Sequence, residues 1–115
     1  MPEINEKQFL ENFQYFDKEV VLEIINIFLE EYPQRMETLQ ANIKERDFDQ
    51  LRFNAHSLKG VVANFVAPEV QELAKTLELK GLNKDTEDLD TIYNELKTKA
   101  DVMVSELKEL KNHFK

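Results

Sequence analysis

The chain has 115 residues, of which 42% are hydrophobic and 33% are charged. That composition suits a single globular domain over residues 1–115 and argues against disorder. Fifteen basic and 23 acidic side chains give a net charge of −8, so no basic face for binding nucleic acid is expected. Cysteine is absent, which excludes a disulfide framework, a thiol nucleophile and a Cys-based zinc site.

No apolar stretch approaches the roughly 20 residues that cross a bilayer. The first residues, Met-Pro-Glu-Ile-Asn-Glu, lack the basic start and apolar run of a signal peptide. We therefore expect a cytoplasmic protein with no membrane contact. Because the chain starts at Met1 and accounts for one complete domain, a free-standing protein is favoured over a piece of a larger sensor.

The spacing of apolar residues predicts two helices in the first part of the chain. The first covers roughly Glu6 to Phe16, and Asp17 then caps the start of the second. The second runs from about Lys18 to Arg46 with an unbroken apolar face. Pro33 lies inside it and predicts a kink or a junction of two helices, of which the continuous apolar face favours the kink.

Three further helices follow. The third runs from about residue 47 or 48 to Phe65, and the fourth begins near Pro68, a residue well tolerated in a first helical turn. Gly81 is expected to cap its end. A polar connection over residues 81–88 leads to the last helix, which begins near Leu89. Amphipathic helices with short connections predict an all-α fold, an antiparallel up-and-down four-helix bundle with an additional short N-terminal helix.

The third helix separates a core face from a surface face at about 100° per residue. Its apolar face is formed by Leu51, Ala55, Leu58, Val62 and Phe65. His56 projects to the opposite side, where a buried structural histidine would not lie. Arg52, Lys59, Gly60 and Ala63 share the face of His56.

Two of these neighbours point to chemistry at His56. Glycine inside a helix costs about 1 kcal/mol relative to alanine, yet Gly60 lies one turn from the histidine, where a missing side chain clears space for another molecule. Lys59 places a positive charge within one helical turn of His56. An exposed imidazole beside a cation and cleared space suits a nucleophile that accepts an anionic group.

Residues 55–60, Ala-His-Ser-Leu-Lys-Gly, resemble the His-x-Leu-Lys-Gly signature of histidine-phosphotransfer (HPt) domains. The resemblance covers nearly the whole chain. Residues 27–33, Ile-Phe-Leu-Glu-Glu-Tyr-Pro, resemble the Phe-Leu-x-x-x-Pro stretch of the family's second helix. Residues 41–47 resemble the run that leads to its acidic helix start, and residues 72–78 resemble the segment after its active helix.

The resemblance implies that His56 is phosphorylated, that Lys59 neutralises phosphoryl charge and that Gly60 admits the partner. Glu78 is the candidate for the family's carboxylate or amide that bonds the imidazole; the alternative is one more solvated glutamate. The chain departs from the pattern at Val61, Val62 and Val66, where the family has small residues and glycine. Val62 faces the core and should be harmless, whereas Val66 puts the path into the fourth helix in question.

By this resemblance the chain relays a phosphoryl group between aspartates of receiver domains, or from a sensor kinase to a response regulator. Nε2 of His56 attacks the acyl phosphate while Glu78 or water orients Nδ1–H. No nucleotide-binding motif is present, so no autokinase activity is expected. The chain needs no cofactor or metal of its own, because Mg²⁺ belongs to the partner's receiver domain. A monomer is expected, since no second apolar face is evident.

The partner surface should surround His56 and include Arg52, Phe53 and Ala63. For Phe53, packing beneath the first helix is the preferred interpretation and docking a receiver helix the alternative. Arg52 is expected to be solvated, with a partner contact as the alternative. His113 is expected at the surface without a chemical role.

Two other classes of function compete with this interpretation. A non-phosphorylated helical adaptor could keep the bundle, but a scaffold has no need of a glycine beside His56. A metal enzyme on a four-helix bundle would need several Glu-x-x-His pairs facing inward, and the chain has only two histidines.

Overall fold

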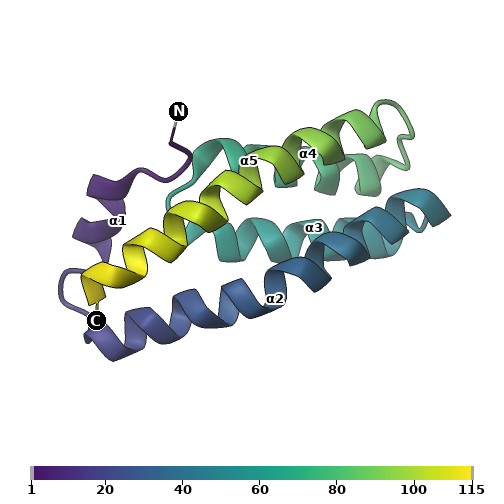
Figure 1. Cartoon of the computed structure of the whole chain (residues 1–115). Coiled ribbons are helices and arrows are strands. Elements are labelled where there is room, and N and C mark those ends of the chain that lie inside the picture. The colour runs from purple at the N-terminus through teal and green to yellow at the C-terminus, as the bar shows by residue number, and fades with distance from the viewer. Residues whose placement is uncertain (1, 115) are drawn as a thin grey trace.

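The structure, a computed structural model, describes residues 2–114. It contains the helices α1 (Glu6–Asn12), α2 (Lys18–Glu45), α3 (Phe48–Ala63), α4 (Pro68–Asn83) and α5 (Leu89–Leu110), and a closing 3₁₀ turn η1 (Lys111–Phe114). No strand occurs within these described residues. The all-α prediction is confirmed (Figure 1).

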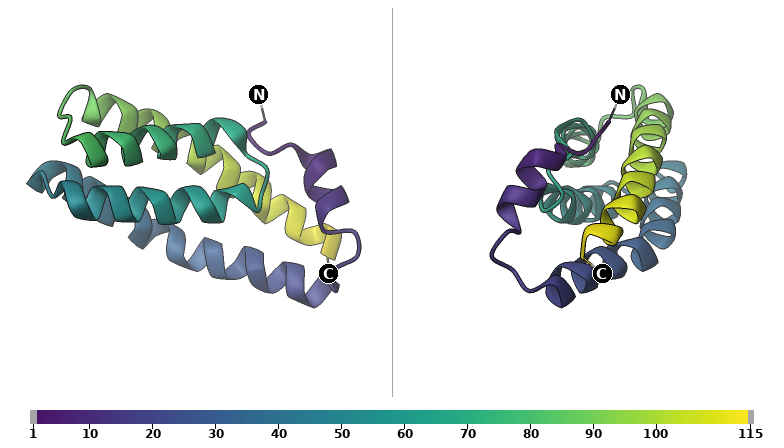
Figure 2. Two further views of the ribbon diagram at one scale, coloured as in Figure 1. Left: turned by 180° about the vertical axis from the view of Figure 1, so that it is seen from behind. Right: turned by 60° about the vertical axis from the view of Figure 1, so that its left-hand side comes forward.

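The four long helices form an antiparallel up-and-down bundle (Figure 1). α3 packs against α2 and α4, and α5 closes the bundle against α4 and α2. At about 1.5 Å per residue, the 28 residues of α2 extend along the full 42 Å length of the molecule. α1 crosses the end of the bundle where α2 begins and α5 ends (Figure 2).

The predicted core face of the third helix is confirmed, but its predicted end at Phe65 is wrong. α3 ends at Ala63, and Phe65 enters the core from the turn that follows. Leu51, Ala55, Leu58, Val62 and Phe65 are fully buried, and removal of their apolar surface from water stabilises the helix against its neighbours. The start of α3 is fixed by Asp47, whose side chain accepts a hydrogen bond from the backbone N–H of Gln50 at 3.2 Å. These contacts determine which side of α3 faces water.

The first helix is shorter than predicted, ending at Asn12 rather than Phe16. Phe13 leaves the helical conformation and turns into the core, where its ring lies 4.9 Å from that of Phe9. Phe16 is 51% exposed. The periodic spacing of the phenylalanines did not reveal this, because Phe13 reaches the core from a turn instead of from a helix.

The second helix is a single element that continues through Pro33, so a junction of two helices there is wrong. Asp17 occupies the predicted N-cap position, although its side chain makes no capping hydrogen bond. Arg46 ends the helix in the left-handed conformation, with φ of 56°. Residues 46 and 47 alone connect α2 to α3, which keeps the two helices adjacent and antiparallel.

The expectation that Gly81 caps α4 is wrong. Gly81 is buried inside the helix, which continues to Asn83 and is capped by Lys84 with φ of 53°. A Cβ atom on Gly81 would lie 2.7 Å from the backbone nitrogen of Arg52 and 2.9 Å from the carbonyl oxygen of Phe48. The glycine is therefore needed for close approach of α3 and α4.

The link between α3 and α4 is where the chain departs from the family pattern, and the structure shows an unusual conformation there. Val66 adopts a left-handed conformation with φ of 55°, which a β-branched residue rarely tolerates. Its carbonyl accepts a hydrogen bond from the N–H of Asn5 at 2.8 Å. The N-terminal segment thus holds the end of α3 in place.

A group of charged residues attaches that N-terminal segment to α5. Oε1 of Glu106 accepts the backbone N–H groups of Glu3 at 2.8 Å and Ile4 at 3.2 Å. The Glu3 carboxylate is buried, 3.8 Å from Lys99, which also lies 3.1 Å from Glu69. Burial raises the pKa of Glu3, the nearby Glu69 and Glu106 carboxylates raise it further, and Lys99 opposes the rise.

We expect Gly81→Ala to destabilise the protein by about 1–3 kcal/mol, because backbone atoms of α3 must move to admit the methyl group. Gly60→Ala is the matched control. A Cβ there would meet nothing within 4 Å outside the backbone of its own helix among the described residues, so the substitution should stabilise the helix by about 0.5–1 kcal/mol. Urea unfolding measures both, and equal effects would contradict the assigned packing role of Gly81.

We expect the stability gained by Glu3→Gln to grow with pH. The folded-state pKa of Glu3 lies above its ordinary value of 4.5, so its favourable contribution is complete below that pH and is lost as pH rises through the folded-state value. Glutamine does not ionise and avoids this loss. Unfolding at a series of pH values, with exposed Glu72→Gln as the control, should show a difference that increases only for position 3; a flat difference would refute it.

Candidate functional site

His56 lies on the outer face of α3, and its side chain is 67% exposed. The residues on either side of it in the chain face the protein instead. Ala55 is fully buried against the core, and Ser57 is half-buried toward α2. The imidazole is therefore held on a rigid helix and open to water. The sequence prediction of an outward-facing histidine is confirmed.

Glu78 of α4 bridges His56 and Lys59. Its Oε2 lies 2.8 Å from Nδ1 of His56, and its Oε1 accepts a hydrogen bond from Nζ of Lys59 at 2.6 Å. The predicted contact between Glu78 and the imidazole is confirmed, and the alternative of a solvated glutamate is wrong, since its side chain is only 19% exposed.

The bridge fixes the protonation of the site. The hydrogen bond from Lys59 lowers the pKa of Glu78, that from His56 lowers it further, and partial burial opposes them. An ionised carboxylate only accepts hydrogen bonds, so the neutral imidazole donates from Nδ1–H. Nε2 then carries the lone pair and faces away from Glu78. The arrangement prepares Nε2 as a nucleophile.

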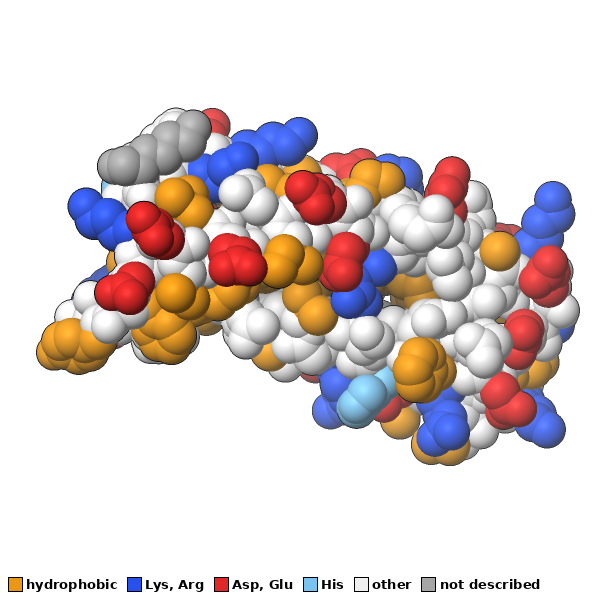
Figure 3. Space-filling model, turned by 90° about the horizontal axis from the view of Figure 1, so that it is seen from below, with side chains coloured by type: hydrophobic (Ala, Val, Ile, Leu, Met, Phe, Trp, Pro, Cys, Tyr) orange, Lys and Arg blue, Asp and Glu red, His pale blue; other side chains and the backbone are white. Residues whose placement is uncertain are grey.

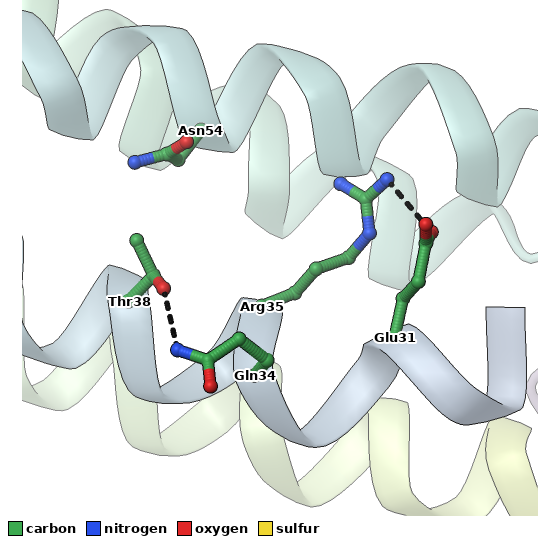
Figure 4. A pocket seen from close by; sticks show the side chains of 5 residues that line it. All are labelled: Glu31, Gln34, Arg35, Thr38 and Asn54. Carbon is green, nitrogen blue, oxygen red and sulfur yellow. Dashed lines mark hydrogen bonds and ion pairs between the residues drawn. The ribbon is translucent and has the colours of Figure 1, made fainter.

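Polar contacts on the other side of α3 hold it against α2. Nη1 of Arg35 donates to Oγ of Ser57 at 2.9 Å, and Nη2 donates to Oε1 of Glu31 at 3.3 Å. Arg35 and Glu31 also line a cleft of about 260 Å³, together with Gln34, Thr38 and Asn54 (Figure 4). The sequence did not single out Arg35, because only the tertiary contact of α2 with α3 brings it beside Ser57.

The open side of the helix is where Gly60 was predicted to clear space. Apart from the neighbouring residues and backbone of its own helix, no heavy atom of residues 2–114 lies within 4 Å of the position a Cβ would take on Gly60. Arg52 and Ala63, on the same face, are exposed. An approaching molecule therefore meets no side chain from residue 60.

Exposed apolar side chains also occur around the site. Phe53 is 67% exposed, so the preferred interpretation that it packs beneath the first helix is wrong. Leu79 and Leu82 on α4 are 46% and 57% exposed. Neither leucine was predicted to belong to the site, although their position off the apolar face of α4 could have indicated it. Hydrophobic and basic side chains lie beside an exposed histidine in Figure 3.

Metal-binding clusters and membrane spans are two further features that the described residues could contain. Over residues 2–114, no group of three or more His, Asp or Glu side chains is placed to hold a metal ion. In the same range, no helix combines the length and apolar character that a membrane span requires. His113 is 54% exposed, as predicted, and lies 3.7 Å from Glu6.

A helical bundle that presents one exposed histidine, oriented by a carboxylate and beside a bare backbone patch, has the architecture of a phosphotransfer protein. Residues 23–113 match the Hpt domain family, and the chain belongs to that family. Its role is histidine phosphotransfer in phosphorelays. It acts there as a phosphotransfer intermediate and interacts with receiver domains or kinases.

Comparison with solved structures shows the same fold in another protein. The crystal structure of histidine-containing phosphotransfer protein B (HptB) from Pseudomonas aeruginosa PAO1 matches with a TM-score of 0.88. The match covers 99% of this chain and 98% of that chain at 18% sequence identity. No curated protein sequence matches the chain significantly.

We expect Glu78→Ala to abolish the preference of His56 for the Nδ1–H tautomer. Removing the carboxylate removes the only acceptor that the described residues place at Nδ1, so the proton redistributes to Nε2. ¹⁵N NMR of the neutral imidazole measures the tautomer ratio, with Glu72→Ala of the same helix as the control. An unchanged Nδ1–H population in Glu78→Ala would show that the bridge does not orient the ring.

Proposed function

We propose that His56 is the residue that carries the phosphoryl group, relaying it between aspartates of receiver domains or from a sensor kinase to a response regulator. The observation that supports this most strongly is the imidazole itself. It is 67% exposed, it is bonded at Nδ1 by Glu78 at 2.8 Å, and Nε2 is left for attack. No other histidine in residues 2–114 has a carboxylate within hydrogen-bond distance.

The transfer follows from this protonation state. The lone pair of Nε2 attacks phosphorus of the partner's aspartyl phosphate, the new N–P bond forms, and the P–O bond to the aspartate breaks. The aspartate leaves as a carboxylate with the electron pair, and the ring becomes an N-phosphorylated imidazolium. Glu78 stabilises that cation through Nδ1–H, which is a charge-assisted hydrogen bond. The reverse sequence passes the group to the next aspartate.

Lys59 and Gly60 support this step in different ways. Lys59 neutralises Glu78 and brings positive charge to the site where phosphoryl charge arrives. Gly60 leaves room for the partner's loops to reach Nε2. Such positioning and charge neutralisation are what phosphoryl transfer requires of a protein.

The partner we propose is a receiver domain that docks over His56 on Arg52, Phe53 and Ala63. Its own carboxylates hold the Mg²⁺ that the reaction needs, so this chain uses no cofactor. The exposed leucines of α4, Leu79 and Leu82, extend the apolar part of the docking surface. We further propose that the chain acts in the cytoplasm as a monomer and has no autokinase activity.

Incubation with a phosphorylated receiver domain tests the assignment of His56. Wild type should take up phosphate that is stable to alkali and labile to acid, as expected of a phosphohistidine, while His56→Gln should take up none and keep its helical content. Equal uptake by both proteins would overturn the assignment. Uptake by neither, with several receivers, would favour the adaptor, a helical bundle that binds without being phosphorylated.

Gly60→Ala provides a second arm of this test. The added methyl group should slow transfer from the receiver although it makes the helix more stable. A loss of transfer that accompanies a gain in stability identifies an obstruction at the interface instead of a folding defect. An unaltered transfer rate would remove partner access from the role of Gly60.

A further inference from the structure

Charge at the site is balanced before transfer and unbalanced after it. The neutral imidazole, the Glu78 carboxylate and the Lys59 ammonium sum to no net charge when they are joined as the structure shows. Phosphorylation makes the ring a cation and adds a group of about two negative charges. One negative charge is left without a partner, in a protein whose net charge is already −8. A further cation is needed beside the phosphoryl oxygens.

Lys59 brings positive charge to the site and is already counted in this sum, but its ammonium is bonded to Glu78. Its ammonium lies 2.6 Å from Glu78, which is bonded to the Nδ1 side of the ring, while the phosphoryl group leaves the ring from Nε2. The bonds from these two nitrogens diverge, so Lys59 and the phosphoryl group lie on different sides of the imidazole. The phosphorylated ring still pairs with Glu78, but taking Lys59 away would remove one of the two hydrogen bonds of this partly buried carboxylate, which is unfavourable.

Arg35, the nearest cation from α2, is also held elsewhere. Its guanidinium is bonded to Ser57 at 2.9 Å. It is also bonded to Glu31 at 3.3 Å (Figure 4), and its side chain is only 23% exposed. Ser57 projects about 100° around the helix from His56, on the side opposite Lys59. Arg35 therefore anchors α3 to α2 from the flank of the site.

Arg52 is the remaining cation on the face of His56. It is exposed, and within residues 2–114 its guanidinium makes no hydrogen bond or ion pair. It precedes His56 by four residues, which is one helical turn. Side chains on a helix lean toward its N-terminus, so the imidazole extends over the turn that carries Arg52. The backbone of this turn is fixed by its close contact with Gly81.

We propose that Arg52 contacts the phosphoryl oxygens on Nε2 of His56, both during transfer and in the stored phosphohistidine. This inference rests on the proposed phosphorylation of His56. It adds a direct contact from Arg52 to the positive charge that Lys59 brings to the site. A guanidinium suits the task, because its planar fork donates two parallel hydrogen bonds to a phosphoryl group.

The experiment uses phosphoramidate as donor, so that no partner surface is involved. Nε2 attacks phosphorus, the N–P bond of the donor breaks, and its protonated amino group leaves as ammonia with the electron pair. Wild type, Arg52→Gln, Arg52→Lys and Lys108→Gln are compared by rate of phosphorylation, phosphohistidine lifetime and ³¹P chemical shift. Lys108 is an exposed residue of α5 and controls for the loss of one positive charge.

We expect Arg52→Gln to slow phosphorylation about twofold to fivefold, the range of an exposed charge pair, and to move the ³¹P resonance. Arg52→Lys should restore part of the rate, and Lys108→Gln should match wild type. The effect of Arg52→Gln should shrink as salt rises.

Three results would count against the inference. Phosphorylation of His56 in Arg52→Gln with wild-type rate and ³¹P shift overturns it while leaving the proposed function intact. A defect seen only with a receiver as donor also overturns it, because Arg52 would then contact the partner. No phosphorylation of His56 in wild type by either donor overturns the proposed function, and this inference with it.

Discussion

The carboxylate of Glu78 is the contact on which the rest of the site depends. It joins Nδ1 of His56 and Nζ of Lys59 at 2.8 and 2.6 Å, and so sets the tautomer of the ring and the position of the lysine together. The contact spans two helices, so it exists only if α3 and α4 lie close in a fixed register. Gly81 makes that approach possible by leaving no side chain between them.

The bundle holds the site rigid from several directions. The Glu78 bridge connects α4 to α3, and the hydrogen bond between Arg35 and Ser57 connects α2 to α3. Residues such as Ala55 and Leu58 bury the inner face of α3 in the core. The imidazole can therefore be exposed to water and still be oriented. This combination suits a carrier, which must present the same atom to a donor and later to an acceptor.

Much of the architecture could be predicted from the sequence, because helical periodicity is a local property. The bundle, the core face of α3 and the outward direction of His56 all follow from the spacing of apolar residues. The two glycines show where that reasoning ends. Gly60 was correctly placed on an open helix face, whereas Gly81 was taken for a helix cap and is instead a point of contact between helices.

The other sequence-based predictions that failed, or that were not made, also depend on contacts between helices. Phe53 has the character of a core residue but lies on the water-facing side of α3, and Phe13 enters the core from a turn. Arg35 gains its role only through a residue 22 positions away. Such assignments depend on which elements meet in space, and the pattern along a single helix does not contain that information.

The left-handed conformation of Val66 explains how the chain tolerates its difference from the family at that position. Strain of about 1–2 kcal/mol is expected for a side chain there, and it is offset by packing of the half-buried valine against the core. Glycine would remove the strain and the packing together. The sign of the stability change for Val66→Gly is therefore set by the difference between these two opposing contributions.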